Sequence, residues 1–264
     1  MPELPEVEAM RRRVSAQALD REVARVTAPD AEALRGTSPA GLGRAVTGRA
    51  FRAVRRHGKV LFARAGDGPW LALHFGMTGD LALLAPGEAP PEHARVVFDF
   101  ADGGRLAFDN PRRLGWLELT GDVETYRAEA GLGPDALALD RADVARIVGG
   151  TRGQVKPALM DQSKLAGIGN VYSDEILFRA RLRPDAIGAE LDAAALAALH
   201  AALRDVLETA SARLARGVAL PDDWLARHRE AGARCPRCGG ALAREKIGGR
   251  SARFCPRCQG GADG

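Results

Sequence analysis

Cys235-Pro236-Arg237-Cys238 and its copy, Cys255-Pro256-Arg257-Cys258, decide how the C-terminal end of the chain folds. The two tetrapeptides hold all four cysteines of the protein, and residues 239–254 separate them. Two such CxxC pairs at this separation can supply four thiolates to a tetrahedral Zn²⁺. The alternatives are a redox pair and a chance repeat. The spacing favours one structural zinc ion bound by Cys235, Cys238, Cys255 and Cys258.

The segment 239–254 predicts a β-hairpin with its turn near Gly248-Gly249. A hairpin this short has no core of its own, so we expect the metal to hold it together. Its exposed basic side chains would be Arg244, Lys246, Arg250 and Arg253. A rigid basic hairpin suits insertion into a DNA groove, and the alternative is a ribbon that binds nothing.

The segment upstream of the cysteines has a helical pattern. Apolar residues recur with helical spacing over 191–214, which predicts a long amphipathic helix that serves the core. Ala166-Gly167-Ile168-Gly169-Asn170 predicts a tight turn that opens a helix at Val171. Glycines and Pro134 in 131–150 mark the expected linker between two domains.

The first half of the chain alternates short apolar runs with turns. Residues 5–19 predict a helix with Val7, Met10 and Val14 on its apolar face. Strands are predicted at 60–62, 71–73, 96–98 and 105–108, the last two joined by a hairpin turn at 101–104. Several short strands in succession favour a β-sandwich.

The N-terminus begins Met1-Pro2-Glu3. Initiator methionine is normally removed before a residue as small as proline, which would leave Pro2 as a secondary amine. An α-amino group has a pKa of about 7.7–8.0, so a useful fraction is neutral and nucleophilic near pH 7. Glu3 could act as the neighbouring general acid or base. An ordinary chain start without chemistry is the alternative, and this dipeptide alone does not exclude it.

Composition sets broad limits on the function. The chain has 264 residues, a net charge of +4 and a pI near 9.1, which suits a polyanionic partner but also an ordinary solvated surface. We find no run long enough for a membrane helix and no signal-peptide pattern. Cysteines confined to one metal motif favour a reducing compartment. We therefore expect a cytoplasmic protein that does not bind membranes.

Taken together, these motifs make the chain similar to the formamidopyrimidine-DNA glycosylase (Fpg, MutM) family. The matching strings lie in the family's order over nearly the whole chain: 1–8, 55–59, 74–79, 110–115, 161–162, 166–172, 249–251 and the four cysteines. The strings at 1–8 and 166–172 are the most specific. The resemblance implies an α+β fold with an N-terminal β-sandwich, a helical domain containing a helix-two-turn-helix, and a zinc-ribbon hairpin. The corresponding divisions are 1–130, 131–150 as linker, 151–232 and 233–264.

The resemblance also implies roles for individual residues. Double-stranded DNA would lie between the two halves, with the damaged nucleotide flipped out of the helix. Pro2 would be the Schiff-base nucleophile, Glu3 the acid/base, and Lys59 and Arg250 would assist at the active site. The side chains that fill the vacated space would be Met77, Arg112 and Leu114. The phosphate or DNA contacts would be Arg113, Lys156, Asn170 and Arg250.

The chain departs from the family pattern at several positions. Leu114 replaces a common aromatic wedge, Asn110 stands where Asp is usual, and Ala252 where Thr is frequent. The segment 217–235 looks too short for the glycine-rich loop that caps an oxidised purine in the family. A preference for 8-oxoguanine therefore does not carry over.

We expect a monomeric bifunctional DNA glycosylase/AP lyase of base excision repair, which removes oxidised bases and cleaves the strand by β,δ-elimination. The alternatives are an endonuclease VIII-like enzyme for oxidised pyrimidines, an enzyme that is mainly an AP lyase, and a non-catalytic protein that binds damaged DNA. The presence of Pro2, Glu3 and Lys59 argues against the last. A zinc-ribbon transcription factor would leave the N-terminal string unexplained.

Overall fold

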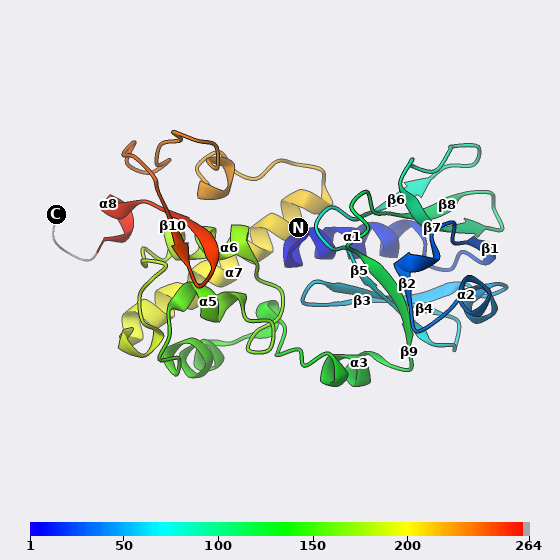
Figure 1. Ribbon diagram of the computed structural model, residues 1–264, viewed down its shortest axis with the longest axis horizontal. Helices are drawn as coiled ribbons and strands as arrows, with labels where there is room; N and C mark the ends of the chain where they lie inside the picture. The colour runs from blue at the N-terminus through cyan, green and yellow to red at the C-terminus, as the bar shows by residue number, and fades with distance from the viewer. Residues whose placement is uncertain (261–264) are drawn as a thin grey trace. The chain divides into compact units, whose positions relative to one another are not determined.

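The computed structural model describes residues 1–260 (Figure 1). The chain divides into two compact units, of which the first spans Met1–Ala130 and the second begins at Gly131. Among the described residues, no helix combines the length and the apolar character that crossing a bilayer requires.

Helix α1 (Leu4–Gln17) starts the first unit; it begins one residue before and ends two residues before the predicted bounds. A capping box fixes its beginning, because the Glu6 carboxylate accepts a hydrogen bond from the backbone N–H of Glu3 at 2.9 Å and the reciprocal bond is also present. Pro5 fits the first turn, where no N–H is needed. The start of the chain is therefore held by the helix itself.

Two sheets follow α1. One has the strand order β1-β7-β8-β6 and the other β2-β9-β5-β4-β3, and only the β2–β9 pair is parallel. The strands are β1 (Val23–Thr27), β2 (Leu34–Arg35), β3 (Phe51–His57), β4 (Val60–Ala65), β5 (Trp70–His74), β6 (Asp80–Leu84), β7 (Ala94–Phe100), β8 (Arg105–Asp109) and β9 (Trp116–Thr120). All four predicted strands and the hairpin between β7 and β8 are confirmed. Helices α2 (Pro39–Val46) and α3 (Val123–Glu129) complete the unit.

One apolar core joins α1 to both sheets. Val7, Met10 and Val14 of α1 pack into the same cluster as buried residues of β4, β5, β7 and β8. Phe51 of one sheet meets Phe98 of the other edge-on at 5.7 Å between ring centroids. The predicted β-sandwich is confirmed, with α1 as part of its core.

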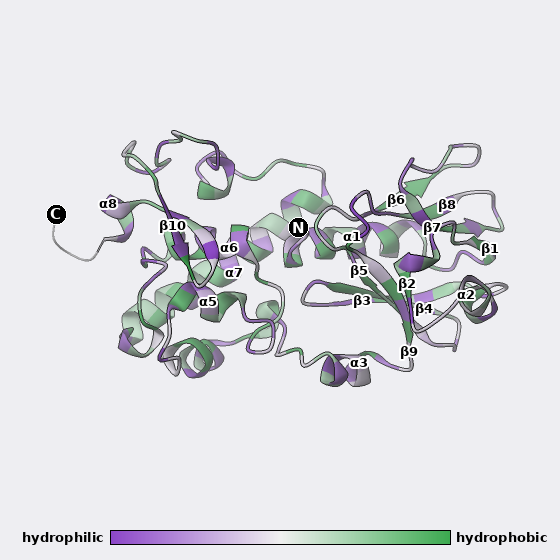
Figure 2. Cartoon of the chain, in the orientation of Figure 1, coloured by the Kyte–Doolittle hydropathy of each residue, from purple (hydrophilic) through white to green (hydrophobic). Residues whose placement is uncertain are grey.

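The second unit is mainly helical. Its helices are α4 (Arg141–Val144), α5 (Val155–Met160), α6 (Asn170–Arg179), α7 (Ala193–Ala215) and α8 (Pro256–Gln259). Helix α7 confirms the amphipathic helix predicted over 191–214, and its buried face packs against α6. A hairpin of β10 (Ala243–Ile247) and β11 (Arg250–Phe254) turns at Gly248-Gly249, as predicted. Figure 2 shows the hydrophilic character of β10.

The segment 131–150, expected as a linker, carries ordered structure. It contains a 3₁₀ turn (Ala136–Ala138), α4, and a wider helical turn (Ala145–Gly149). Leu139, Val144 and Val148 are buried, and α4 packs against α7. These apolar side chains make the segment part of the second unit.

Candidate functional site

Pro2 and Glu3 stand immediately before α1. Pro2 is half-buried, and the Glu3 side chain is almost completely buried, with 2% exposed. In the capping box the backbone N–H of Glu3 donates to the Glu6 side chain. Because this N–H belongs to the peptide bond between Pro2 and Glu3, the capping box also orders Pro2. The structure thus places an acidic side chain next to the proline on a rigid helix start.

Lys59 lies in the tight turn between β3 and β4. Gly58, the residue before it, has φ +54°, a conformation that glycine adopts without strain. Burial is the main cause that lowers the pKa of His74, and the positive charges of Lys59 and Arg35 lower it further. His74 stacks on Trp116 at 5.4 Å, and its Nδ1 accepts a hydrogen bond from the backbone N–H of Gly76. His74 therefore supports the neighbouring loop as a neutral imidazole.

The two loops that carry the expected wedge residues touch each other. A side chain at Gly76 would collide with the backbone of Leu114, so the turn after β5 lies directly on the loop before β9. Met77 and Leu114 project from these loops with 43% and 49% of their surface exposed. They are two of only four large apolar side chains that are exposed among the described residues. Two adjacent loops of the first unit therefore each present an exposed apolar side chain.

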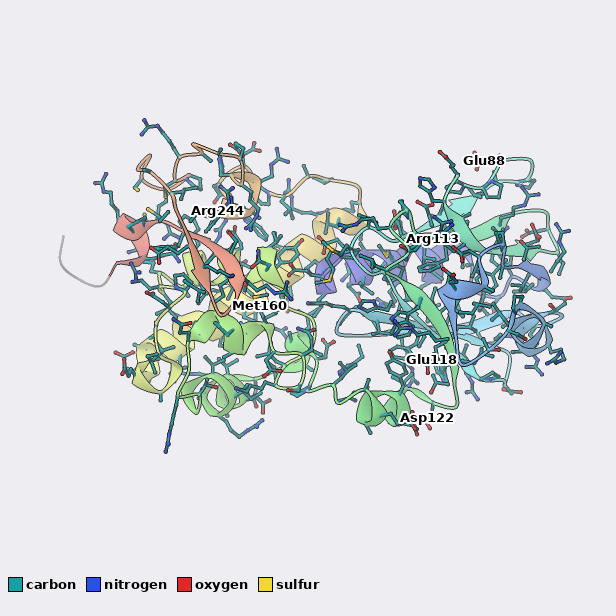
Figure 3. All side chains as sticks on the ribbon, viewed as in Figure 1. Glu88, Arg113, Glu118, Asp122, Met160 and Arg244 are labelled. Atoms are coloured by element: carbon teal, nitrogen blue, oxygen red, sulfur yellow. The ribbon has the colours of Figure 1, made fainter. Side chains whose placement is uncertain are left out.

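Arg112 and Arg113 lie on the second of these loops, and both are exposed. Arg113, labelled in Figure 3, has φ +53°, and its backbone N–H donates to the carbonyl oxygen of Asn110 at 3.2 Å. Asn110 is fully buried, and neither polar atom of its side-chain amide has a hydrogen-bond partner in the described part of the chain. The loop is thus anchored through the backbone of Asn110.

Asn170 is the first residue of α6, after Gly169 as N-cap. The positive end of a helix dipole favours an anionic group at such a position. Its Oδ1 is buried and accepts no hydrogen bond from the described residues. This half-buried amide at a helix N-terminus has the chemistry of a phosphate contact.

Lys156 lies below that helix start and is completely buried. Its Nζ donates to Asp174 Oδ1 at 2.6 Å, Ser173 Oγ at 2.9 Å and the carbonyl oxygen of Asn170 at 3.3 Å. Asp174 also accepts from Arg229 Nη1 at 2.9 Å. The resemblance implied a direct DNA contact for Lys156. In the structure this lysine supports Asn170 from inside the unit, and its contact with DNA stays a prediction.

Arg250 begins β11 at the hairpin turn and is exposed. It lines a cavity of about 180 Å³ with Met160 of α5 and Ile247 of β10; Figure 3 labels Met160 beside the hairpin tip. Gly248 packs so closely on Pro157 that a side chain there would collide with the proline ring. The hairpin tip is therefore seated on α5, which fixes where Arg250 emerges.

The four cysteines come together as a metal site. Their Sγ atoms all lie within 4.8 Å of one another, with Cys235–Cys258 at 3.8 Å and Cys238–Cys255 at 3.6 Å. Four thiolates about 2.3 Å from a tetrahedral Zn²⁺ lie about 3.8 Å apart, so the arrangement fits this ion. Phe178 of α6 and Leu225 pack against the cysteines. The site binds one structural zinc ion, and a small apolar cluster joins it to α6.

The middle of the segment 217–235 is held against α6. Trp224 and Leu225 are buried, the backbone N–H of Ala226 donates to Glu175 Oε2 at 2.8 Å, and Arg229 pairs with Asp174. Burial raises the pKa of Glu175, although the bond from Ala226 opposes the shift. We call residues 218–229 the strap. Its C-terminal part, from Asp223 to Arg229, is fastened to α6.

Sequence reasoning missed several acidic residues that are buried or largely buried near these sites. Asp174 and Asp30 pair with arginines distant in sequence, and no local pattern marks either pair. Glu8 could have been found, because Arg11 and Arg12 follow it at helical spacing.

Comparisons with known proteins agree with this geometry. Three family descriptions match successive parts of the chain: "Formamidopyrimidine-DNA glycosylase N-terminal domain" at 1–117, "Formamidopyrimidine-DNA glycosylase H2TH domain" at 132–221, and "Zinc finger found in FPG and IleRS" at 232–260. Formamidopyrimidine-DNA glycosylases of Halorhodospira halophila and Geobacter metallireducens are 39% and 38% identical, with 98% of this chain and 100% of each relative covered.

Solved structures give the same result. Lactococcus lactis Fpg bound to DNA that contains N7-benzyl-Fapy-dG has a TM-score of 0.86 at 27% identity, covering 98% of this chain and 100% of that one. The Lactococcus lactis Fpg complex with abasic-site DNA has a TM-score of 0.86 at 26% identity, covering 98% and 99% of the two chains.

Proposed function

Because this chain belongs to the formamidopyrimidine-DNA glycosylase family, and is thus a DNA glycosylase of base excision repair, we propose that Pro2 is its nucleophile. The observation that carries this proposal is the ordered start of α1, where a capping box fixes the backbone of Glu3, the residue after Pro2, and the Glu3 side chain is buried. A flexible chain end would lose orientation entropy in each reaction, and a capped helix removes that loss.

The proposed chemistry proceeds stepwise. The neutral Pro2 nitrogen attacks C1′ of the damaged nucleotide, and the base leaves with the electrons of the glycosidic bond while an acid supplies its proton. The sugar ring then opens: the C1′–O4′ bond breaks as the proton of the proline nitrogen passes to O4′, and the nitrogen lone pair forms an iminium ion with C1′. Loss of the C2′ proton then expels the 3′ phosphate, and a second elimination expels the 5′ phosphate. We assign the acid/base role to Glu3, and an electrostatic role at the phosphates to Lys59 and Arg250.

We assign the DNA contacts to both units. Met77, Arg112 and Leu114 would fill the space that the flipped nucleotide leaves. Arg113, Asn170 and Arg250 would bind phosphates, with Asn170 held from below by Lys156. The zinc ion has no part in the chemistry and holds the hairpin that presents Arg250. We propose further that the protein acts as a monomer at the bacterial nucleoid.

Borohydride trapping tests the nucleophile. Reduction of the iminium ion should join the protein covalently to a duplex that contains an abasic site, and mass spectrometry should place the adduct on Pro2. We expect Pro2→Gly to trap far less. Glu3→Gln keeps the amine and should still trap on a preformed abasic site while losing base excision. Full activity of a preparation with Met1 retained would contradict the proposal.

The strap supports a second statement about substrate. Since residues 223–229 are fastened to α6, only the short stretch 218–222 is left to cover a flipped base. We propose that abasic sites and ring-opened purines are better substrates than 8-oxoguanine. Single-turnover rates on matched duplexes with these three lesions test this order, and fastest cleavage at 8-oxoguanine would contradict it.

A further inference from the structure

Glu8 is a buried carboxylate on α1, with 7% of its surface exposed. Its oxygens accept hydrogen bonds from Arg11 at 2.8 and 2.9 Å and from Arg12 at 3.0 Å, both on the same helix. A third arginine, Arg56, comes from β3 and donates from Nε to Glu8 Oε2 at 3.2 Å. One carboxylate therefore joins the helix that follows Pro2 and Glu3 to the neighbouring sheet.

Arg56 continues this connection to the turn that carries Lys59. Its side chain is 7% exposed, and its Nη1 donates to the carbonyl oxygen of Gly58 at 3.1 Å. Gly58 stands directly before Lys59 in the β3–β4 turn. One planar guanidinium thus contacts the helix through Glu8 and the turn through Gly58, which a single lysine ammonium cannot do with the same fixed geometry.

Stability alone gives little reason to bury this ion pair. A buried pair is often no more stabilising than apolar side chains of similar volume. Glu8 already has two partners on its own helix, so Arg56 is not required to neutralise it. What the Arg56 contact adds is a fixed distance and orientation between α1 and the β3–β4 turn.

We propose that Glu8 and Arg56 are positioning residues that hold the Pro2–Glu3 end of α1 in register with Lys59. This inference rests on the proposed function, in which all three of those residues act at one deoxyribose. The pair acts through the geometry of these groups and touches neither the nucleotide nor its phosphates.

The test compares Glu8→Gln and Arg56→Lys with the wild-type protein on a duplex that contains an abasic site. We expect borohydride trapping at saturating DNA to slow by roughly 10- to 100-fold, the effect of a misplacement near 1 Å. The Kd for a duplex with a tetrahydrofuran abasic analogue should stay unchanged. The double variant should trap no more slowly than either single variant, because both break the same connection.

Val14→Ala is the matched control, because Val14 is buried in the same core from α1 and is not among the contacts of Glu8. It should lower Tm to a similar extent and trap at the wild-type rate. Equal slowing in Val14→Ala and Glu8→Gln, or wild-type trapping by Glu8→Gln and Arg56→Lys, would overturn the positioning role while leaving the Pro2 mechanism intact. Absence of trapping by the wild-type protein would overturn both.

Discussion

The carboxylate of Asp30 lies against the guanidinium of Arg113, with Oδ2 3.2 Å from Nε. Asp30 Oδ2 is also 3.6 Å from Nη1 of Arg95, whose Nε donates to the carbonyl oxygen of Asn110. The Arg113 side chain remains 61% exposed, whereas that of Asp30 is 13% exposed. Asp30 therefore holds the Nε side of the Arg113 guanidinium and leaves most of the Arg113 side chain in solvent, accessible to a phosphate.

Asp30→Asn should weaken DNA binding. The amide keeps the oxygen that caps the turn at Ala31 but loses the charge that holds Arg113. An ion pair with one largely exposed partner contributes about 1 kcal/mol or less, which corresponds to roughly a fivefold rise in Kd or less. Fluorescence anisotropy with the tetrahydrofuran duplex measures this. Asp67→Asn, an exposed carboxylate of the same unit, is the control for net charge. Tighter binding by Asp30→Asn would mean that Asp30 competes with phosphate.

Leu114→Ala should separate base excision from strand cleavage. Leu114 is exposed, so its loss should leave Tm unchanged, but the flipped state loses an apolar contact worth about 1–2 kcal/mol. We expect excision from duplex DNA to slow about tenfold, while cleavage of a single-stranded abasic site stays at the wild-type rate. Val218→Ala removes an exposed apolar side chain elsewhere and should change neither rate. A similar loss on single-stranded DNA would assign Leu114 a role other than that of a wedge.

The sequence predicted best what is encoded locally. Cysteine spacing, the glycine turn of the hairpin and the apolar face of α7 each depend on neighbours along the chain, and the structure has all three. Contacts between distant residues were not predictable, since nothing near Glu8 indicates Arg56, 48 positions away. The segment 131–150 was predicted to be a linker because of its glycines. The glycines hid the spacing of the three apolar residues that are buried there, Leu139, Val144 and Val148. Lys156 was matched by position alone, which does not report burial.

Acid should unfold the first unit partly through Glu8. Burial opposes ionisation of Glu8, but hydrogen bonds from Arg11 and Arg12 and the charges of Arg11 and Arg56 outweigh it and lower its pKa to about 2. A carboxyl group with a lowered folded-state pKa stabilises the fold above its unfolded-state pKa of 4.5, and that stabilisation is lost as the pH falls towards 2. Urea unfolding between pH 5 and pH 2 should show a smaller loss of stability in Glu8→Gln than in the wild-type protein. Parallel curves would contradict the assignment.

Removal of zinc should unfold the hairpin and abolish DNA binding. The small cluster of Phe178, Leu225 and the cysteines is too limited to replace the metal bonds. We expect Cys258→Ser to release its zinc to a chelator at concentrations that leave the wild-type protein loaded, and to lose affinity for the tetrahydrofuran duplex. The far-ultraviolet signal of the first unit should persist. Wild-type affinity in a protein shown to be free of zinc would contradict the structural role.

Salt dependence distinguishes a residue that binds phosphate from one that supports it. Each phosphate contact contributes about 0.9 to the slope of log Kd against log salt concentration. Arg250 is exposed, so Arg250→Gln should lower that slope by about one. Lys156 has no exposed surface, so Lys156→Met should raise Kd with the slope unchanged.

Lys156→Met should also destabilise the fold, by about 3 kcal/mol, because Asp174 loses its shortest partner inside the unit. Adding Asp174→Asn to Lys156→Met removes the buried carboxylate charge that has lost its lysine partner. Arg229, the other partner of Asp174, has 25% of its side chain exposed and can be hydrated. The double variant should therefore be more stable than Lys156→Met alone. If Lys156→Met instead lowers the slope as Arg250→Gln does, the ammonium reaches DNA in the complex, and its burial belongs to the free protein only.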